Sequence, residues 1–179
     1  MDKADMKQEG NYRRFMAMVG TSTIIMFGLM YLNTYAIEHV YWSETRFWMM
    51  FVMGAVMAVV MLAFMWGMYR NTTKNWIIVG VAVATFAISL FLARSQVSVD
   101  DTEYMSAMIP HHSIAIMTSE RAGIEDVRVR ALADDIIRAQ RREIAQMQWL
   151  IEDIDRNGVA DTEAKAGQQP VPRFDEAVR

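Results

Sequence analysis

The sequence predicts an all-helical protein in which three membrane-spanning helices precede a helical hairpin. Three long uncharged runs occupy the first half of the chain, and apolar residues at helical spacing occupy the second half. The 179 residues include no Cys. Disulfides, thiolate metal sites and cysteine nucleophiles are therefore excluded.

The uncharged runs cover residues 15–35, 47–69 and 76–93. At 1.5 Å per helical residue, the shortest run reaches about 27 Å, close to the hydrocarbon thickness of a bilayer. A cleaved signal peptide followed by buried core helices fits less well, because the first run is too long for a signal and two more follow it. We expect residues 1–95 to form a membrane domain with three transmembrane helices.

The distribution of positive charge predicts the orientation of these spans. Arg46 and Arg94 flank them on one side, and six residues flank them on the other: Lys3, Lys7, Arg13, Arg14, Arg70 and Lys74. We expect a protein of the cytoplasmic (inner) membrane with a cytoplasmic N-terminus and a periplasmic or extracellular C-terminal domain. The net charge of -3 offers no basic surface, so nucleic acid is not an expected partner.

The second uncharged run carries a Met at every fourth position, namely Met49, Met53, Met57, Met61 and Met65. We interpret this stripe as a packing surface against helices or lipid, because Met fills irregular gaps. A path of thioethers for soft metal ions is the alternative. His39, between the first two runs, is expected to be a solvated interfacial residue, with metal ligation as the alternative.

Residues 96–157 predict a helical hairpin outside the membrane. Asp100 and Glu103 form a start that resembles a capping box, and the helix that follows is expected over about residues 101–122. A second helix is expected over about residues 126–156. The two helices are joined by a short connection that contains a Gly, which favours an antiparallel pair.

The second of these helices carries a heptad stripe that needs a partner helix. The stripe consists of Val129, Ala133, Ile136, Gln140, Glu143, Met147, Leu150 and Ile154. Its two polar members must meet polar partners, since burying either one alone costs about 1–3 kcal/mol.

A lone hairpin buries one stripe of each helix and leaves little core, which is marginal for a separate domain. Self-association into a four-helix bundle buries the remaining apolar positions, among them Ile116, Met117 and Ile137. We expect a homodimer or a higher even-numbered homo-oligomer. Residues 158–179 have no helical or strand period and are expected to form a flexible tail.

Met and His residues gather on the first hairpin helix. Met105, Met108 and His112 share one face, with His111 at its edge, and Pro110 is expected to bend the helix. An antiparallel hairpin brings this face near residues 140–147. No Glu is followed three residues later by His, so a di-iron bundle site is not expected.

Thioether sulfur is a soft ligand and imidazole is a borderline one, so this donor set suits Cu(I) or Ag(I) better than Zn or Mg. The set consists of His111, His112, Met105, Met108 and Met147, with Gln140 and Glu143 nearby. In the alternative interpretation, the His pair is a hydrogen-bonded core doublet that Glu143 satisfies without metal.

The segment YMSAMIPHHSIAIM, followed by ADDIIRAQRREIAQMQWL, resembles the Met-Ile-Pro-His-His family of ferritin-like helical domains of unknown function, some of whose periplasmic members bind copper or silver. The resemblance covers about residues 100–155. It implies a hairpin that completes a ferritin-like four-helix bundle, by internal duplication or by pairing with another copy. By position it implies metal ligands at Met105, Met108, His111, His112, Met117 and Met147, with Gln140 and Glu143 as supporting polar residues.

We therefore expect a membrane-anchored extracytoplasmic protein that binds Cu(I) or a similar ion through Met and His and acts in copper or silver handling or tolerance. An enzyme is not expected, because the sequence shows no nucleophile paired with a base and no phosphate-binding loop. The alternative function is a structural or interaction module that assembles membrane complexes through a helical bundle, without metal.

Overall fold

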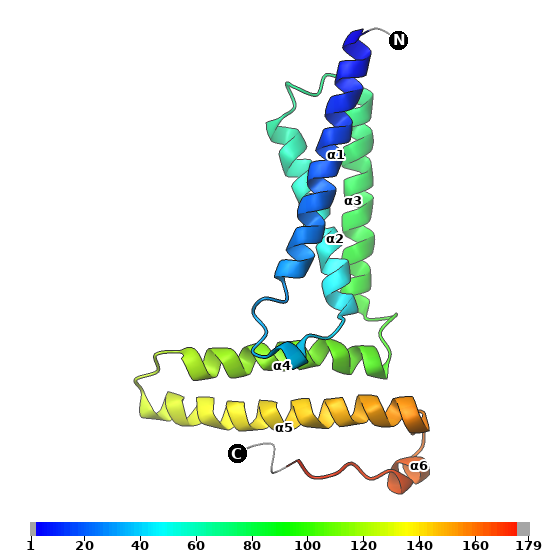
Figure 1. Cartoon of the computed structure of the whole chain (residues 1–179). Helices are drawn as coiled ribbons and strands as arrows, with labels where there is room; N and C mark the ends of the chain where they lie inside the picture. Colours follow the sequence, from blue (N-terminus) through cyan, green and yellow to red (C-terminus); the bar gives the residue numbers. More distant parts are fainter. Residues whose placement is uncertain (1–2, 175–179) are drawn as a thin grey trace. The chain divides into compact units, whose positions relative to one another are not determined.

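The computed structural model describes residues 3–174, with side chains from residue 11 onward, and contains helices but no strands within this range. The predicted all-helical class is confirmed. Residues 1–2 and 175–179, which fall in the predicted membrane domain and tail, lie outside the described residues. The helices are α1 (Lys3–Leu29), η1 (Ile37–His39), α2 (Glu44–Phe64), α3 (Thr72–Ser95), α4 (Asp101–Arg121), α5 (Val127–Asn157) and α6 (Glu163–Gln168). Figure 1 labels the α-helices.

The chain divides into two compact units. The first unit runs through Met30 and continues over Glu44–Ser98, and the second unit comprises Tyr31–Ser43 and the chain from Val99 onward. The segment Tyr31–Ser43 therefore belongs with the hairpin, although the sequence suggested only a connection between two spans.

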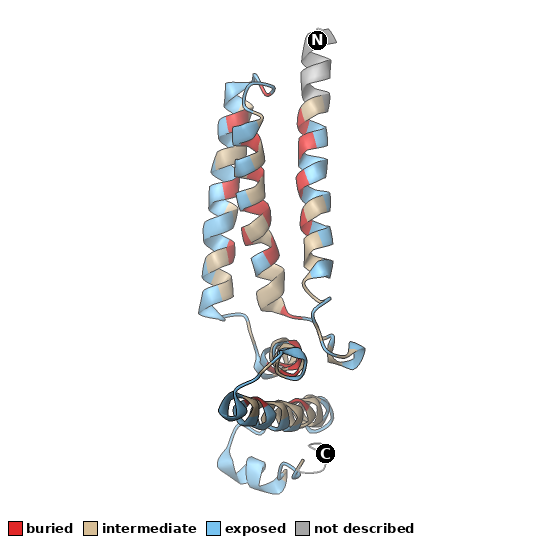
Figure 2. Ribbon diagram, turned by 90° about the vertical axis from the view of Figure 1, so that its left-hand side faces the viewer, coloured by how far each residue is buried: buried red, intermediate tan, exposed pale blue. Residues whose placement is uncertain are grey.

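In the first unit, α2 packs against both α1 and α3. Buried residues occur along the whole length of α2, as Figure 2 shows. Several of them are small, such as Ala55 and Ala58, and small residues allow neighbouring helices to approach closely. Helices α2 and α3 are long and apolar enough to cross a membrane, each with a mean hydropathy of 2.4 over its most apolar window.

Helix α1 differs from the first predicted span, residues 15–35. It begins at Lys3, includes Arg13 and Arg14, and ends at Leu29, so its uncharged helical part is 15 residues long. That part spans about 22 Å, less than the hydrocarbon thickness of roughly 30 Å. Helices α2 and α3 are accordingly the two candidate spans found among the described residues.

A buried polar network joins α1 to the first turn of α3 and to the connection that precedes it. The Tyr12 hydroxyl donates to Asn75 Oδ1 at 2.7 Å and lies 3.2 Å from the carbonyl oxygen of Asn71. The Asn75 Nδ2 group donates to the Tyr69 carbonyl at 2.7 Å, and Asn75 is completely buried. These bonds satisfy the Asn75 amide, which would otherwise be costly to bury.

In the second unit, α4 and α5 form the predicted helical hairpin. The capping box at the start of α4 is present: Asp100 Oδ1 accepts from the Glu103 backbone N–H at 2.8 Å, and a Glu103 carboxylate oxygen accepts from the Asp100 N–H at 3.2 Å. Helix α5 begins after Asp126, whose side chain accepts from the Arg128 N–H, and ends before Gly158. Both helices end within one residue of their predicted boundaries.

The hairpin core is formed by Ile109 and Ile116 of α4 and by Ile144 of α5. Around this core pack Ile137, Met147 and Ile151, together with Tyr41. The inner stripe of α5 therefore differs from the predicted heptad stripe by one residue at three places, where Ile137, Ile144 and Ile151 replace Ile136, Glu143 and Leu150. Because α5 has a broad apolar face, a slight rotation of the helix buries Ile144 and leaves the Glu143 carboxylate at the edge of the hairpin core, where it stays partly hydrated.

Ile116, which we expected to be covered by a second copy, is already 1% exposed in the single hairpin. It packs against Ile144 and is fully used by the core of one chain. This position is therefore not part of any surface available for self-association.

The segment Tyr31–Ser43 lies on α4. The Tyr35 backbone N–H donates to Ser113 Oγ at 2.8 Å, and His39 Nδ1 lies 3.0 Å from the same oxygen. Tyr41 packs on the hairpin core, and its hydroxyl accepts from Gln148 Nε2 at 3.5 Å. His39, expected to be solvated, is half-buried against a completely buried serine.

We predict that Gly54→Ala destabilises the contact between α1 and α2. A Cβ at Gly54 would lie 2.7 Å from Thr23 Oγ1 and 3.1 Å from Thr23 Cγ2, so rotation of this β-branched side chain cannot relieve both contacts. Thermal unfolding in detergent should show a loss of about 1–2 kcal/mol.

The matched control is Gly80→Ala in α3, where an added Cβ meets no atom within 4 Å. This variant should leave the midpoint temperature of thermal unfolding unchanged or slightly raised, because Ala has a higher helix propensity than Gly. Adding Thr23→Ala to Gly54→Ala should restore most of the loss. Equal stabilities for Gly54→Ala and the starting protein would contradict the proposed close approach.

Candidate metal centre

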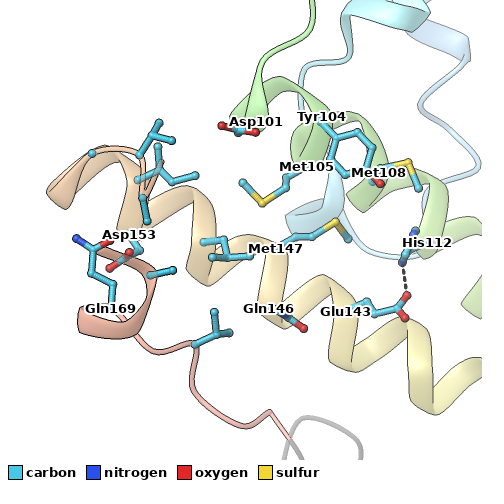
Figure 3. Close-up of a pocket in the computed structure, with 17 residues that line it drawn as sticks. Asp101, Tyr104, Met105, Met108, His112, Glu143, Gln146, Met147, Asp153 and Gln169 are labelled. Carbon is cyan, nitrogen blue, oxygen red and sulfur yellow. Dashed lines mark ion pairs between the residues drawn. The ribbon is translucent and has the colours of Figure 1, made fainter. Parts of the chain in front are cut away.

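A cavity of about 680 Å³ opens on the hairpin between α4, α5 and the chain that follows α5 (Figure 3). Helix α4 supplies residues spaced three and four apart, which is the spacing of a single helix face, and α5 supplies a second face with the same spacing. The α4 residues are Asp101, Tyr104, Met105, Met108 and His112, and the α5 residues are Glu143, Gln146, Met147, Leu150, Asp153 and Ile154.

Three thioethers and one imidazole line this cavity. Met105, Met108 and His112 come from α4, and Met147 comes from α5. Figure 3 shows the sulfur atoms of Met105 and Met147 toward the middle of the cavity, with Met108 and His112 beyond them. The expected meeting of the α4 face with the segment around residue 147 is thus present in the structure.

The His112 side chain is 14% exposed and lies against the Glu143 carboxylate, with Nδ1 3.1 Å from Oε2. Despite this distance, Nδ1 is buried and makes no hydrogen bond among the described residues, because the carboxylate approaches at a poor angle. A buried nitrogen without a hydrogen bond is unfavourable, and a ligand in the cavity would relieve this cost.

Burial lowers the pKa of His112 below its usual value of 6.5. The Glu143 carboxylate opposes this shift and raises the pKa, whereas His111 lowers it. The net result favours the neutral imidazole, which is the form that binds a metal ion.

Three of the predicted site residues lie away from the cavity. His111 is exposed, and its ring centroid is 6.1 Å from that of His112. Met117 and Gln140 are half-buried and do not line the cavity. The two adjacent histidines therefore differ in environment, because successive residues of a helix point about 100° apart.

The cavity also includes residues that sequence analysis missed. Tyr104 and Gln146 belong to the lining, and both lie one position before a predicted Met ligand in the sequence. The helical spacing of Asp101, Tyr104 and Met108 was a signal that could have identified Tyr104. The wall formed by residues after Asn157 had no comparable signal, because that segment lacks a period.

The donors in this cavity are softer than those of common hard-metal sites. Within residues 3–174 no group of three or more His, Cys, Asp or Glu side chains is arranged to hold a metal ion. Three carboxylates, from Asp101, Glu143 and Asp153, also line the cavity. A cation held among the methionines would meet thioether sulfur and a single imidazole, a set that favours Cu(I) or Ag(I) over Zn, Mg or Ca.

Comparison with known proteins identifies a family and a relative of this chain. Residues 95–175 match the family described as "Domain of unknown function (DUF305)". The chain is also 32% identical over 109 residues to the uncharacterized protein L153 of Acanthamoeba polyphaga mimivirus, and the similarity covers 60% of this chain and 70% of that protein. No solved structure matches the chain. The family description mentions neither a ferritin-like fold nor the Met-Ile-Pro-His-His motif, so both stay predictions.

We predict that the metal-free protein titrates His112 with a pKa below 6.5, as measured by NMR of the imidazole protons. Because the unfolded chain then binds this proton more tightly, the contribution of neutral His112 to stability is complete above pH 6.5 and decreases as the pH falls toward the folded pKa.

Glu143→Gln removes the carboxylate that raises the His112 pKa, so the pKa of His112 should fall further. The matched control is Glu152→Gln on an exposed position of α5, which should leave the His112 titration unchanged. An unchanged His112 pKa in Glu143→Gln would show that the carboxylate does not act on this imidazole.

Proposed function

The chain belongs to the family described as Domain of unknown function (DUF305), and we propose that its hairpin binds a soft monovalent metal ion, Cu(I) or Ag(I), in the cavity between α4 and α5. The ligands are the thioethers of Met105, Met108 and Met147 and the imidazole of His112. The observation that carries the proposal is the convergence of these four side chains on one cavity.

Charge also supports this proposal. Three thioethers and a neutral imidazole carry no charge, so a bound monovalent ion would leave one positive charge in a partly buried site. The Glu143 carboxylate, whose Oε2 lies 3.1 Å from His112 Nδ1, balances that charge. Between Asp100 and Arg156 the hairpin has 12 acidic residues against 7 Arg, which attracts cations to this unit.

The proposal places this site on a membrane anchor. Helices α2 and α3 are suited to span the bilayer, and α1, whose positive residues precede its apolar part, accompanies them as a third, shorter span. The excess of Lys and Arg at the N-terminal side favours a cytoplasmic N-terminus and a hairpin outside the cytoplasmic membrane. There the protein acts in metal handling or tolerance and does not catalyse a reaction.

Self-association of the hairpin belongs to the same proposal. At the N-terminal end of α5, Val129 and Leu132 are 48% and 59% exposed, although the same helix buries its other face. A second hairpin that covers these side chains would complete a four-helix bundle. The same surface suits the alternative function, an assembly module that binds no metal.

The test is titration of the purified full chain in detergent with Cu(I), under reducing conditions and against a competing chelator. We expect His112→Gln to weaken Cu(I) binding by about 100-fold, equivalent to about 2.7 kcal/mol. The triple variant with Leu at positions 105, 108 and 147 should bind still less, while its core volume is nearly conserved.

The matched controls are His111→Gln and Met117→Leu, which change the same residue types outside the cavity. Both should retain the starting affinity within about threefold, a difference smaller than 1 kcal/mol. Saturating Cu(I) should also raise the unfolding midpoint of the starting protein but not that of the triple variant. If His111→Gln and His112→Gln lose Cu(I) affinity equally, the proposed site is wrong. If the starting protein and its variants all fail to bind Cu(I) stoichiometrically, the result favours the assembly module.

A further inference from the structure

We propose that residues 158–174, here named the tail cover, form a movable wall that controls access to the cavity. This inference deepens the proposed function and rests on it for the identity of the ion. The wall itself is visible in the structure: Gly158, Val159, Ala160, Ala166, Gln169 and Val171 line the cavity opposite the helical faces (Figure 3).

The side chains of the tail cover are unsuited to hold the ion. The lining positions after Asn157 are glycine, alanine, valine and one glutamine, so they contribute no thioether, imidazole or carboxylate. The donors all come from α4 and α5. What the tail cover adds is mostly apolar surface, which narrows the access of solvent to the sulfur atoms and the imidazole.

The tail cover is held only lightly. Val159 and Val171, its largest lining side chains, are 52% and 43% exposed, and neither belongs to the hairpin core. Its hydrogen bonds are local: Thr162 Oγ1 accepts from the Lys165 N–H at 3.3 Å, and Lys165 Nζ pairs with Asp161 at 2.6 Å. Within residues 3–174 the bond that ties it to α5 is the helix cap, from the Gly158 N–H to the Ile154 carbonyl at 2.9 Å.

A segment with few buried contacts and local hydrogen bonds opens at low free energy, whereas the hairpin core does not. Helix α6 illustrates this difference, because within residues 3–174 it packs against none of the other helices. The tail cover can therefore leave the cavity without disturbing the packing of Ile109, Ile116 and Ile144.

Gly158 is the pivot of this movement. Its φ of 78° and ψ of 175° lie in a region that glycine adopts readily and other residues avoid. This conformation turns the chain away from the axis of α5 and directs it back along the helix. The returning end is near α5 again at a second recess, which Val171, Pro172, Arg173 and Phe174 form with Arg142 and Gln146.

The size of the cavity indicates why a movable wall is needed. A volume of about 680 Å³ holds on the order of 20 water molecules, far more than a single ion with four ligands requires. An ion entering from solvent needs an open path, and an ion once bound is protected from water and competing ligands only when that path is closed. The tail cover should thus slow entry and release together and change the equilibrium affinity little.

The first test uses metal-free protein and is independent of the ion. Hydrogen peroxide oxidises Met sulfur according to its access to solvent, and mass spectrometry of peptides resolves each Met. In the full chain with Val159→Ser and Val171→Ser, and in a chain ending at Gly158, Met147 and Met105 should be oxidised about fivefold faster than in the starting protein. Met117, outside the cavity, is the internal reference and should keep its rate.

The matched control variant is Val127→Ser, which replaces an equally apolar and even more exposed valine at the far end of α5. It should leave the oxidation of Met105 and Met147 unchanged. Unchanged oxidation of both residues after removal of the tail cover overturns the proposal, because the wall would then shield nothing.

The second test measures exchange of Cu(I). Removing the tail cover should raise the rates of uptake and of release to a chelator by a similar factor, about tenfold, while the dissociation constant stays within about threefold. A large loss of affinity without faster uptake would show that the tail supplies a ligand, and it would overturn the gating role. If the starting protein takes up no Cu(I), the proposed function fails, and the peroxide experiment still decides whether the tail covers the cavity.

Discussion

The packing of Ile109 and Ile116 against Ile144 is the interaction on which the second unit depends. Residues four apart on a helix share a face, so directing these two isoleucines of α4 inward also directs Met105 and His112, each one turn earlier, toward α5. On the facing helix, burial of Ile144 places the neighbouring Glu143 at the edge of the core and Met147 three residues further along the same side. The cavity is thus a consequence of how three apolar side chains pack.

The chemistry of the site follows from this arrangement. His112 is buried enough for its pKa to fall, which favours the neutral imidazole, yet it stays beside a carboxylate that is 41% exposed. Glu143 keeps much of its hydration, so its carboxylate can lie beside a cation without the full cost of burying an ion pair. With three thioethers beside the imidazole, the proposed site combines neutral soft donors with the carboxylates of Asp101, Glu143 and Asp153 on the cavity wall.

Two segments outside the hairpin helices complete this unit. Tyr31–Ser43 binds α4 through the buried hydroxyl of Ser113, the residue that follows His112, and residues 158–174 line the cavity beside the proposed ligands. Their attachments differ in kind: the first segment adds Tyr41 to the hairpin core, whereas the second contributes exposed valines and local hydrogen bonds. In the proposed function, this difference would let the helical faces of the cavity stay in place while access to them changes.

The sequence by itself determined the features that depend on neighbours along the chain. Hydropathy located α2 and α3, the side chains of Asp100 and Glu103 started α4, Gly158 ended α5, and the spacing of Met105, Met108 and His112 put them on one face. Tertiary packing alone decided that Ile144 and not Glu143 enters the core, that His112 lines the cavity while His111 stays exposed, and that the chain around Tyr41 joins the hairpin. The physical reason is that a rotation of α5 by one residue changes the seam without changing the periodicity, so only the fit of side chains from the opposite helix and from distant segments can select it.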